Sequence, residues 1–163
     1  MRLRSNLMPV LAACALIACA PKADVAKIDS AALAMTTMAP KSLFDRLGGQ
    51  ASIATVVDGF VANVAADARI NKHFGRVASD TAAMRQFKAK LVDQICQGTG
   101  GPCTYAGLDM KTAHKGMALT DADFDALVDD LVKALDAAAV PKQEKDDLLG
   151  VLGPMRADIV TKK

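Results

Sequence analysis

The stretch GGPCTYAGLDMKTAH, residues 100–114, decides how the rest of the chain is interpreted. It begins as a glycine-rich loop, where regular structure stops. It ends in a brief run, Met110 to Lys115, that is long enough for little more than one helical turn. That turn carries His114, one of only two histidines in the 163 residues. A neutral imidazole held by so small an element is a natural metal ligand, so His114 is the first candidate functional residue.

The segments before this stretch have the apolar periodicity of amphipathic helices. One stripe follows the i, i+3, i+4, i+7 spacing of a single helical face and comprises Ile53, Val56, Val57, Phe60, Val61 and Val64. A second stripe, which a cap at Ser79 or Asp80 would introduce, comprises Met84, Phe87, Leu91 and Ile95. Both stripes are expected to be buried in a common core.

The chain after residue 114 predicts two further helices. Thr120 to Asp123 resembles a capping box, and the helix that it opens presents an apolar stripe of Phe124, Leu127, Val128, Leu131 and Leu135. A final helix follows Pro141, which suits a first helical position, and should bend near Gly153-Pro154. A short helix from Leu43 to Leu47 precedes all of these. No stretch alternates with period two, so the fold class is all-α.

Composition and charge exclude some classes of partner. Hydrophobic residues make up 52% of the chain but aromatic residues only 4%, which favours helices over sheets. The 20 basic residues are nearly balanced by 18 acidic ones. Lys and Arg do not cluster into a basic stripe, so no nucleic-acid partner is expected.

The first residues have the layout of a secretion signal. Arg2 and Arg4 precede an apolar run over residues 7–18 that is too short to be a permanent membrane span. The run ends in Leu16-Ile17-Ala18-Cys19, which resembles a bacterial lipobox. That resemblance implies a signal peptide over residues 1–18 and lipidation of Cys19. Residues 19–41 lack sustained apolar periodicity and are expected to form a flexible tether to a domain over residues 42–163. The lipobox resemblance also implies attachment to a bacterial membrane on the periplasmic side, with Ala20 favouring the outer membrane. An ordinary signal cleaved near Ala18 or Ala20 is the alternative.

Two cysteines remain in the expected domain, Cys96 and Cys103. In the oxidising compartment of an exported protein, an even pair of cysteines is a candidate disulfide. Seven residues separate the two across a turn, which is compatible with a bond between them. Two free thiols or a pair of metal ligands are the alternatives.

Four motifs, taken in order, resemble one known family. They are FDRLGG at residues 44–49, GGP and YAG at 100–102 and 105–107, MKTAH at 110–114, and LTDADF at 119–124. Together they resemble the group 1 truncated haemoglobins, and the likeness extends from about residue 42 to 160. The resemblance implies two helix pairs stacked two-over-two on a haem, with one helix reduced to about a turn.

In this resemblance His114 matches the proximal ligand of the haem iron. A neutral imidazole ligand needs an acceptor for its other nitrogen, and the carbonyl of Met110, one turn earlier, is a candidate. A surface histidine on an amphipathic turn is the alternative. The cofactor implied is haem b, and the residues expected to line its cavity are Phe74, Phe87, Leu91, Ile95, Tyr105, Met110 and Leu127. These residues are equally compatible with packing in a helix stripe or, for Tyr105, with anchoring a loop. His73 is expected to be exposed rather than a ligand.

The distal side departs from the family pattern. Phe60 is followed by Val61 where many members carry Tyr, and Phe87 and Leu91 occupy positions that often carry Gln. Losing a hydrogen bond to an iron-bound, partly charged ligand costs about 1.5–3 kcal/mol, so high-affinity O2 binding is not expected. Lys90, 24 residues before His114, is a possible distal ligand; alternatively it reaches a haem propionate or solvent.

The resemblance implies a haem protein that binds diatomic gases such as O2 and NO. Some members oxidise NO to nitrate, which would need an external electron donor, because this chain has no flavin or nicotinamide site of its own. The sequence leaves enzymatic activity open. Two other classes also stay open: a redox or gas-sensing haem module with Lys90 as distal ligand, and a cofactor-free helical lipoprotein.

Overall fold

The structure, a computed structural model, describes residues 40–162. The expected signal, most of the expected tether and Cys19 lie outside the described residues. Contacts between Cα atoms divide the chain into residues 1–37 and residues 38–163, and everything that follows concerns the second unit.

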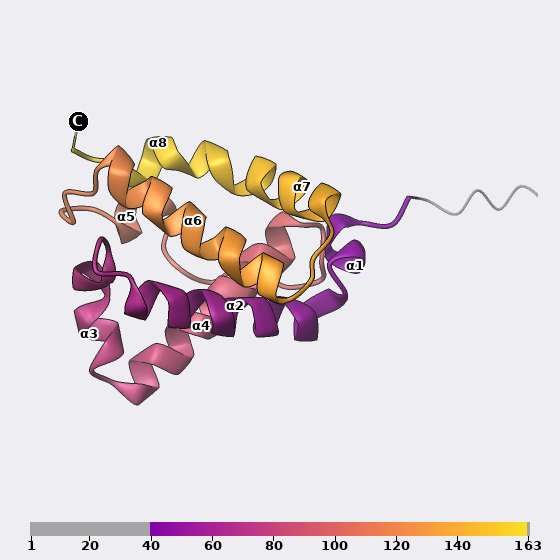
Figure 1. The fold of residues 1–163 in the computed structure, drawn as a ribbon, viewed down its shortest axis with the longest axis horizontal. Coiled ribbons are helices and arrows are strands. Elements are labelled where there is room, and N and C mark those ends of the chain that lie inside the picture. Colours follow the sequence, from indigo (N-terminus) through magenta and orange to yellow (C-terminus); the bar gives the residue numbers. More distant parts are fainter. Residues whose placement is uncertain (1–39, 163) are drawn as a thin grey trace, which may run out of the picture. The chain divides into compact units, whose positions relative to one another are not determined.

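The described residues form helices and loops without a β-strand, as the sequence predicts (Figure 1). In chain order the elements are α1 (Leu43–Arg46), α2 (Gly49–Ala66), the 3₁₀ helix η1 (Asn71–Phe74), α3 (Gly75–Ala78), α4 (Thr81–Gly98), α5 (Met110–Ala113), α6 (Asp121–Ala137), α7 (Lys142–Leu152), the 3₁₀ helix η2 (Gly153–Met155) and α8 (Arg156–Ile159).

Two helix pairs are stacked on each other. Figure 1 shows α2 beside α4 and α6 beside the α7–α8 segment. The most extensive contacts are those of α2 with α6 and with α4, so α2 joins the two pairs. Small residues allow the α2–α6 approach, since a Cβ added to Gly59 would lie 3.6 Å from the Cβ of Ala134. The two-over-two arrangement therefore depends on a close helix crossing at residues without bulky side chains.

The helix boundaries follow from capping side chains. Asp80 caps α4, because its Oδ1 accepts from the backbone N–H groups of Ala82 and Ala83 at 2.7 and 3.1 Å. Thr120 and Asp123 form the predicted capping box at the start of α6, in which each side chain accepts from the other residue's backbone N–H. Pro141 has an extended ψ of 155° and is the N-cap of α7, one position earlier than predicted.

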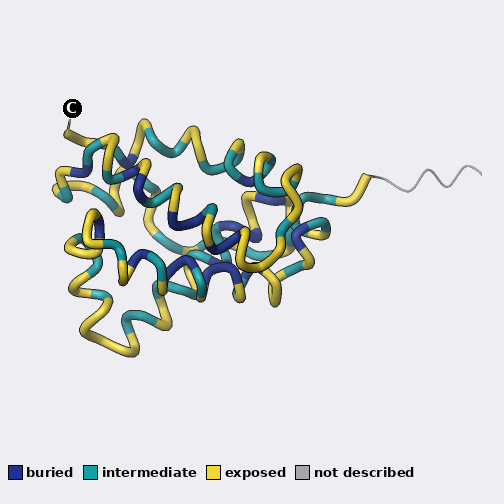
Figure 2. The backbone as a smooth tube through the Cα atoms, in the orientation of Figure 1, coloured by how far each residue is buried: buried dark blue, intermediate teal, exposed yellow. Residues whose placement is uncertain are grey.

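The buried face of α2 is the one predicted, and all six residues of its stripe are buried (Figure 2). The prediction for α4 was partly wrong. Ile95 is buried, but Met84, Phe87 and Leu91 are only half-buried, and the other buried residues of this helix are Val92 and Cys96. The apolar stripe of α4 therefore lies at the edge of the core.

The prediction for α6 was also partly wrong. Leu127 and Val128 are half-buried, whereas Ala126, Asp130 and Ala134 are buried beside Phe124, Leu131 and Leu135. Small residues are buried here because the close crossing with α2 excludes larger ones. Periodicity of large apolar residues alone does not reveal such a face.

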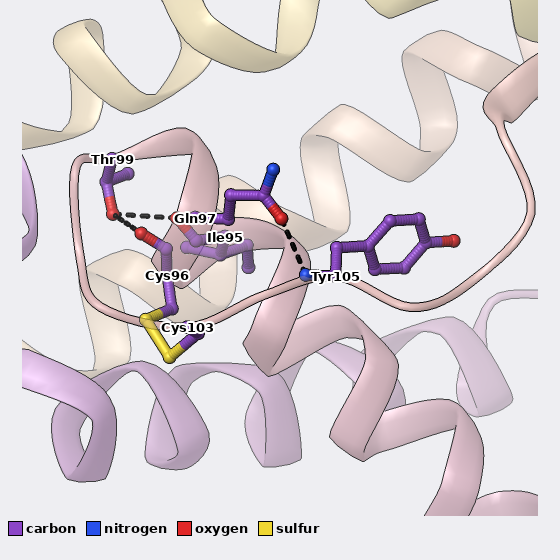
Figure 3. Close-up of a disulfide and its surroundings, with 6 residues drawn as sticks. All are labelled: Ile95, Cys96, Gln97, Thr99, Cys103 and Tyr105. Atoms are coloured by element: carbon purple, nitrogen blue, oxygen red, sulfur yellow. Dashed lines mark hydrogen bonds between the residues drawn. A yellow bond between two sulfur atoms is a disulfide. The ribbon is translucent and has the colours of Figure 1, made fainter.

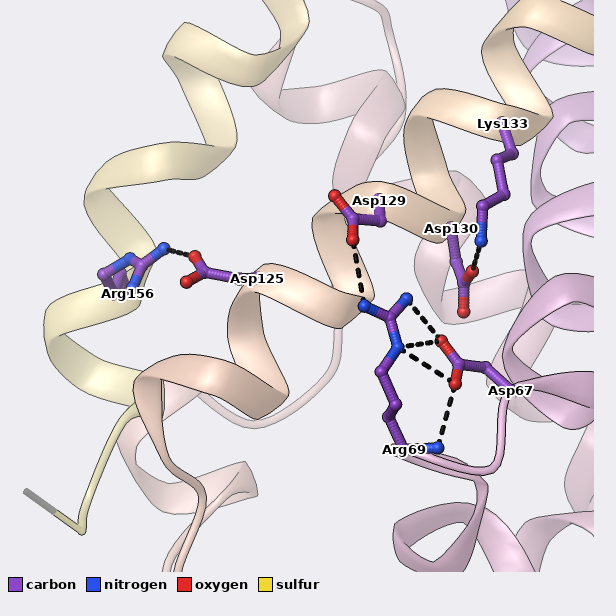
Figure 4. Close-up of polar contacts among 7 residues, drawn as sticks. All are labelled: Asp67, Arg69, Asp125, Asp129, Asp130, Lys133 and Arg156. Atoms are coloured by element: carbon purple, nitrogen blue, oxygen red, sulfur yellow. Dashed lines mark hydrogen bonds and ion pairs between the residues drawn. The ribbon is translucent and has the colours of Figure 1, made fainter.

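Ion pairs surround the acidic face of α6 (Figure 4). Arg69, in the loop after α2, pairs with Asp67 at 2.7 Å and with Asp129 at 3.0 Å. Arg156 of α8 pairs with Asp125 of α6, which links α6 to the end of the chain. The buried Asp130 accepts from Lys133 at 2.8 Å. The pairs of Arg69 and Arg156 lie at the surface, where ion pairs add little to stability, whereas the carboxylate of Asp130 is buried.

Among residues 40–162, no single helix is both long and apolar enough to cross a membrane. The pair formed by α2 with residues 71–78 meets that test by length and composition only, with a bend of 115° between its parts.

Gly101 provides a test of how tightly the loop after α4 is packed. A Cβ at this position would lie 2.5 Å from the ring of Phe44 and 2.6 Å from the Sγ of Cys96, and this sulfur is held in a disulfide. We expect Gly101→Ala to lower the free energy of unfolding by about 1–3 kcal/mol, measured by urea denaturation followed by circular dichroism.

Gly150→Ala is the matched control for this substitution. Gly150 lies inside α7 with nothing within 4 Å of an added Cβ, so alanine should raise the free energy of unfolding by about 0.5–1 kcal/mol. Equal effects of the two substitutions would contradict the close packing at Gly101.

Candidate functional site

The apolar interior consists of two separate clusters of buried residues. The larger one is formed mainly by α2, α4 and α6, and the smaller one comprises Leu119, Phe124 and Ile159. Leu127 and Val128 are consecutive residues of α6, yet the first packs against the larger cluster and the second against the smaller. We call the boundary between the clusters the seam.

Half-buried apolar side chains border this seam. Phe74, Phe87, Leu91 and Leu127 pack against the larger cluster, and Met110, Met117 and Val128 against the smaller one. Apolar side chains that a fold leaves half-exposed between two clusters provide a site for a large apolar group. Four of the predicted cavity residues, Phe74, Phe87, Leu91 and Leu127, lie on one side of the seam, and Met110 lies on the other. Ile95, also predicted to line a cavity, is buried within the larger cluster.

His114 ends the four-residue helix α5 and is half-buried. Its Nδ1 lies 2.8 Å from the carbonyl oxygen of Met110, one turn earlier. Because a carbonyl oxygen only accepts, Nδ1 carries the proton, and Nε2 of the neutral ring has a free lone pair. This is the form in which histidine coordinates a metal, and the Met110 carbonyl is the acceptor that the sequence suggested.

The short helix α5 is held at its beginning by a side-chain cap. Asp109 Oδ1 accepts from the backbone N–H of Thr112 at 2.9 Å, and the hydrogen bonds from Thr112 lower the pKa of Asp109. The backbone N–H of His114 donates to the same Met110 carbonyl that accepts from its ring, at 3.1 Å. His114 is thus fixed to its own turn by two hydrogen bonds to one oxygen, one from its ring and one from its backbone.

Sequence reasoning missed Gln94 of α4. Its half-buried side chain donates from Nε2 to the sulfur of Met110 at 3.3 Å and to the sulfur of Met155 at 3.4 Å. The signal was present, because Gln94 follows Phe87 by seven positions and Leu91 by three and so shares their helical face. It was overlooked because the stripe was defined by apolar residues only.

The loop between α4 and α5 is cross-linked (Figure 3). Cys96 and Cys103 are joined by a disulfide. The Oε1 of Gln97 accepts from the backbone N–H of Tyr105 at 2.6 Å, and the hydroxyl of Tyr105 donates to the carbonyl of Leu108 at 2.9 Å. Burial raises the pKa of the Tyr105 hydroxyl, and the nearby Asp109 adds to this effect. These contacts are those of a loop anchor, the alternative that the sequence had left open for Tyr105.

A small apolar cavity of about 70 Å³ lies between α2, η1, α3 and α4. Water occupies roughly 30 Å³ per molecule in the liquid, so the cavity has room for molecules of diatomic size. The rings of Phe74 and Phe87 meet edge-to-face there, with centroids 5.9 Å apart. Asn71 is its one polar lining residue, and the others are Phe60, Val61, Val64, Ala65, Phe74, Ala78, Met84 and Phe87.

The two other candidate polar residues have different surroundings. Lys90 is exposed on α4.

His73 was predicted to be exposed, and that prediction was wrong, since only 16% of its side chain is accessible. The η1 turn places His73 against the start of α6, where its Nε2 lies 3.4 Å from Asp123 Oδ1. That separation is too long for a good hydrogen bond, and Nε2 has no other partner among the described residues.

Comparison with known proteins identifies the family. A family description for bacterial-like globins matches residues 42–161. The group 1 truncated haemoglobin GlbN of Mycolicibacterium paratuberculosis is 33% identical over 122 residues, which is 75% of this chain and 86% of the relative. This chain is a truncated haemoglobin.

Solved structures of the truncated haemoglobin family share its fold. The Fe(III) form of truncated haemoglobin from Tetrahymena pyriformis superposes with a TM-score of 0.67 at 29% identity, covering 75% of this chain and 100% of the other. The 2/2 haemoglobin from Synechococcus sp. PCC 7002, in the cyanomet state with covalently attached haem, gives a TM-score of 0.66 at 31% identity. The match covers 74% of this chain and 98% of the other. The all-α, two-over-two architecture is thereby confirmed.

The seam fits the cofactor that this family implies. Haem is a flat, largely apolar macrocycle whose iron accepts a nitrogen of a neutral imidazole. The truncated haemoglobin described here offers half-buried apolar side chains on both sides of the seam, and one imidazole whose Nδ1 is occupied and whose Nε2 is free. Residues 40–162 hold no cluster of three or more His, Cys, Asp or Glu arranged for a metal ion.

The capping box at the start of α6 makes the stability of the fold depend on pH. The hydrogen bonds from Thr120 lower the pKa of Asp123 from 3.8 to about 2, and His73 adds to this effect. A carboxylate with a depressed native pKa stabilises the fold fully above its unfolded pKa, and this stabilisation is lost as the pH falls toward the native pKa. The part contributed by Asp123 should therefore disappear between about pH 4 and pH 2.

We expect Asp123→Asn to unfold at lower urea concentration than the unmodified chain at pH 5, with the difference shrinking as the pH falls to 2. Urea midpoints measured across this range test the prediction. Asp158→Asn, which removes an exposed carboxylate from α8, corrects for the general change in charge. A difference that stayed constant with pH would show that Asp123 acts without its charge.

Proposed function

We propose that this truncated haemoglobin binds haem b at the seam, with His114 as the proximal ligand, and that it binds diatomic gases such as O2 or NO. The observation that carries the proposal is the 2.8 Å contact between His114 Nδ1 and the Met110 carbonyl, on a four-residue helix beside the seam. It leaves Nε2 available for the iron. Family membership supports both the cofactor and the class of ligand.

The residues have distinct roles in this proposal. His114 Nε2 would donate its lone pair to the iron, while the Met110 carbonyl holds the ring proton on Nδ1 and raises the donor strength of the ring. Phe74, Phe87 and Leu127 would cover the porphyrin from the side of the larger cluster, and so exclude water from it. The haem supplies the iron on which a gas ligand binds.

The distal surroundings favour weak retention of O2. The cavity beside Phe60 and Val61 is apolar except for Asn71, so no tyrosine hydroxyl is present there to donate to a bound ligand. A tyrosine donor contributes about 1.5–3 kcal/mol, so O2 would escape roughly tenfold to hundredfold faster than from a tyrosine-equipped site. The amide of Asn71 is the remaining side-chain donor in the lining of this cavity. NO carries less charge when bound and depends less on such a donor. Conversion of NO to nitrate would need an external electron donor and stays outside this proposal.

Export to the bacterial envelope is part of the proposal. The signal-like first 18 residues and the lipobox-like end at Cys19 support it. The disulfide between Cys96 and Cys103 is compatible with it, because disulfides persist in oxidising compartments. Lipid attachment at Cys19 would place the domain on the periplasmic face of a membrane.

The His114 substitution tests the central assignment. We expect purified wild-type protein, loaded with hemin, to show a Soret band and to bind CO in the ferrous form. His114→Ala should lose most of the haem, and His114→Gly should regain the spectrum when imidazole is added, because free imidazole fills the place of the side chain.

His73→Ala is the matched control, since it removes the second histidine of the chain. Retention of the wild-type spectrum in His114→Ala, or its loss in His73→Ala alone, would contradict the assignment. A wild-type protein that folds but shows no Soret band after haem is supplied would instead support a cofactor-free helical lipoprotein.

Lys90 separates the gas-binding proposal from the sensing alternative. Its side chain is exposed on α4. We therefore expect Lys90→Ala to leave the ferric and ferrous absorption spectra unchanged. A change from low-spin to high-spin bands in this variant would overturn the expectation. It would favour the sensing haem module in which Lys90 is the distal ligand of the iron.

A further inference from the structure

Gln94 is a polar side chain on the face of α4 that borders the seam. It is half-buried, and its Nε2 donates to two sulfurs, that of Met110 in α5 and that of Met155 in η2. Gln94 thus connects α4 directly to two elements on the other side of the seam.

A thioether is a weak acceptor, and an exposed amide would gain more by donating to water. Gln94 is half-buried, and its Nε2 donates to these two sulfurs in the structure. The two contacts, at 3.3 and 3.4 Å, bring both sulfurs to one amide nitrogen and so restrict two long, flexible methionine side chains.

The element that this contact restrains cannot hold itself in place. α5 has four residues, far fewer than the number at which a helix is stable without outside contacts. Its cap at Asp109 fixes its start, and Met110 packs against the smaller cluster. The sulfur of Met110 also accepts from Gln94, which ties the first residue of α5 to α4. The carbonyl of this same residue accepts from the ring of His114.

We propose that Gln94 is a positioning residue for His114: it holds Met110 by the sulfur, and Met110 holds the imidazole by the carbonyl. This inference rests on the proposed function for its meaning, because the imidazole matters as an iron ligand. A helix that carries Phe87 and Leu91 on one side of the seam thereby sets the orientation of the ring on the other side. A displacement of α4 would be passed to His114 through this contact.

The first test uses the protein without haem. Gln94→Leu removes the amide at similar size, and Gln94→Glu keeps the shape but removes both donors. Gln86→Leu makes the same chemical change at an exposed position of the same helix and is the matched control. With ¹⁵N-labelled histidine, NMR reports the proton on His114 Nδ1 and its exchange with water. We expect about fivefold faster exchange in both Gln94 variants and no change in the control.

The second test uses haem-loaded ferrous protein. The iron–imidazole stretching band in resonance Raman should shift and broaden in Gln94→Leu and Gln94→Glu, and should stay in place in Gln86→Leu. A residue that merely supports folding would lower the unfolding midpoint without moving this band in the molecules that still hold haem.

The results separate the two proposals. Folded Gln94 variants with unchanged ring exchange and an unchanged band would overturn the role of Gln94, whatever the wild type binds. Wild-type protein that takes up no haem would overturn the proposed function, and the exchange experiment would still decide whether Gln94 fixes the ring of His114.

Discussion

The hydrogen bond from His114 Nδ1 to the Met110 carbonyl is the constraint on which the candidate site depends. It fixes the tautomer of the ring and leaves Nε2 as the donor atom. A four-residue helix provides no cooperative stability of its own, so everything around it serves to hold this bond in place. The Asp109 cap, the cross-linked loop after α4 and the Gln94 contact all do so from different directions.

The fold provides the seam in which such a histidine is useful. Close packing of α2 on α6, at Gly59 and Ala134, gathers most apolar residues into one cluster. The end of the chain builds a second, smaller cluster around Phe124. A continuous core would have left no room for a flat cofactor. The division of the core, rather than any single pocket, is therefore what suits this truncated haemoglobin to a prosthetic group.

Much of the fold was predictable from the sequence because its signals are local. Caps at Asp80 and Thr120 depend on neighbouring residues only, and the stripe of α2 faces a single environment. The Met110 carbonyl was also predictable as a partner of His114, since four residues of helix bring the two together.

The rest depends on contacts between segments that are distant in sequence. The stripe through Phe87 and Leu91 borders the seam instead of lying in the core, and periodicity does not distinguish these two kinds of apolar surroundings. Gln94 gains its meaning only from Met110 and Met155, which are 16 and 61 residues away. His73 was predicted to be exposed because nothing near it in the sequence indicated that η1 packs against α6.

The most direct test of the account is electron–nuclear double resonance on the ferric protein with ¹⁵N-labelled histidine. The chain contains only two histidines, so His73→Gln leaves His114 as the sole labelled residue. The account predicts a strongly coupled ¹⁵N nucleus from one directly bound imidazole nitrogen in this variant. Haem-loaded His73→Gln without any coupled ¹⁵N nucleus would contradict it.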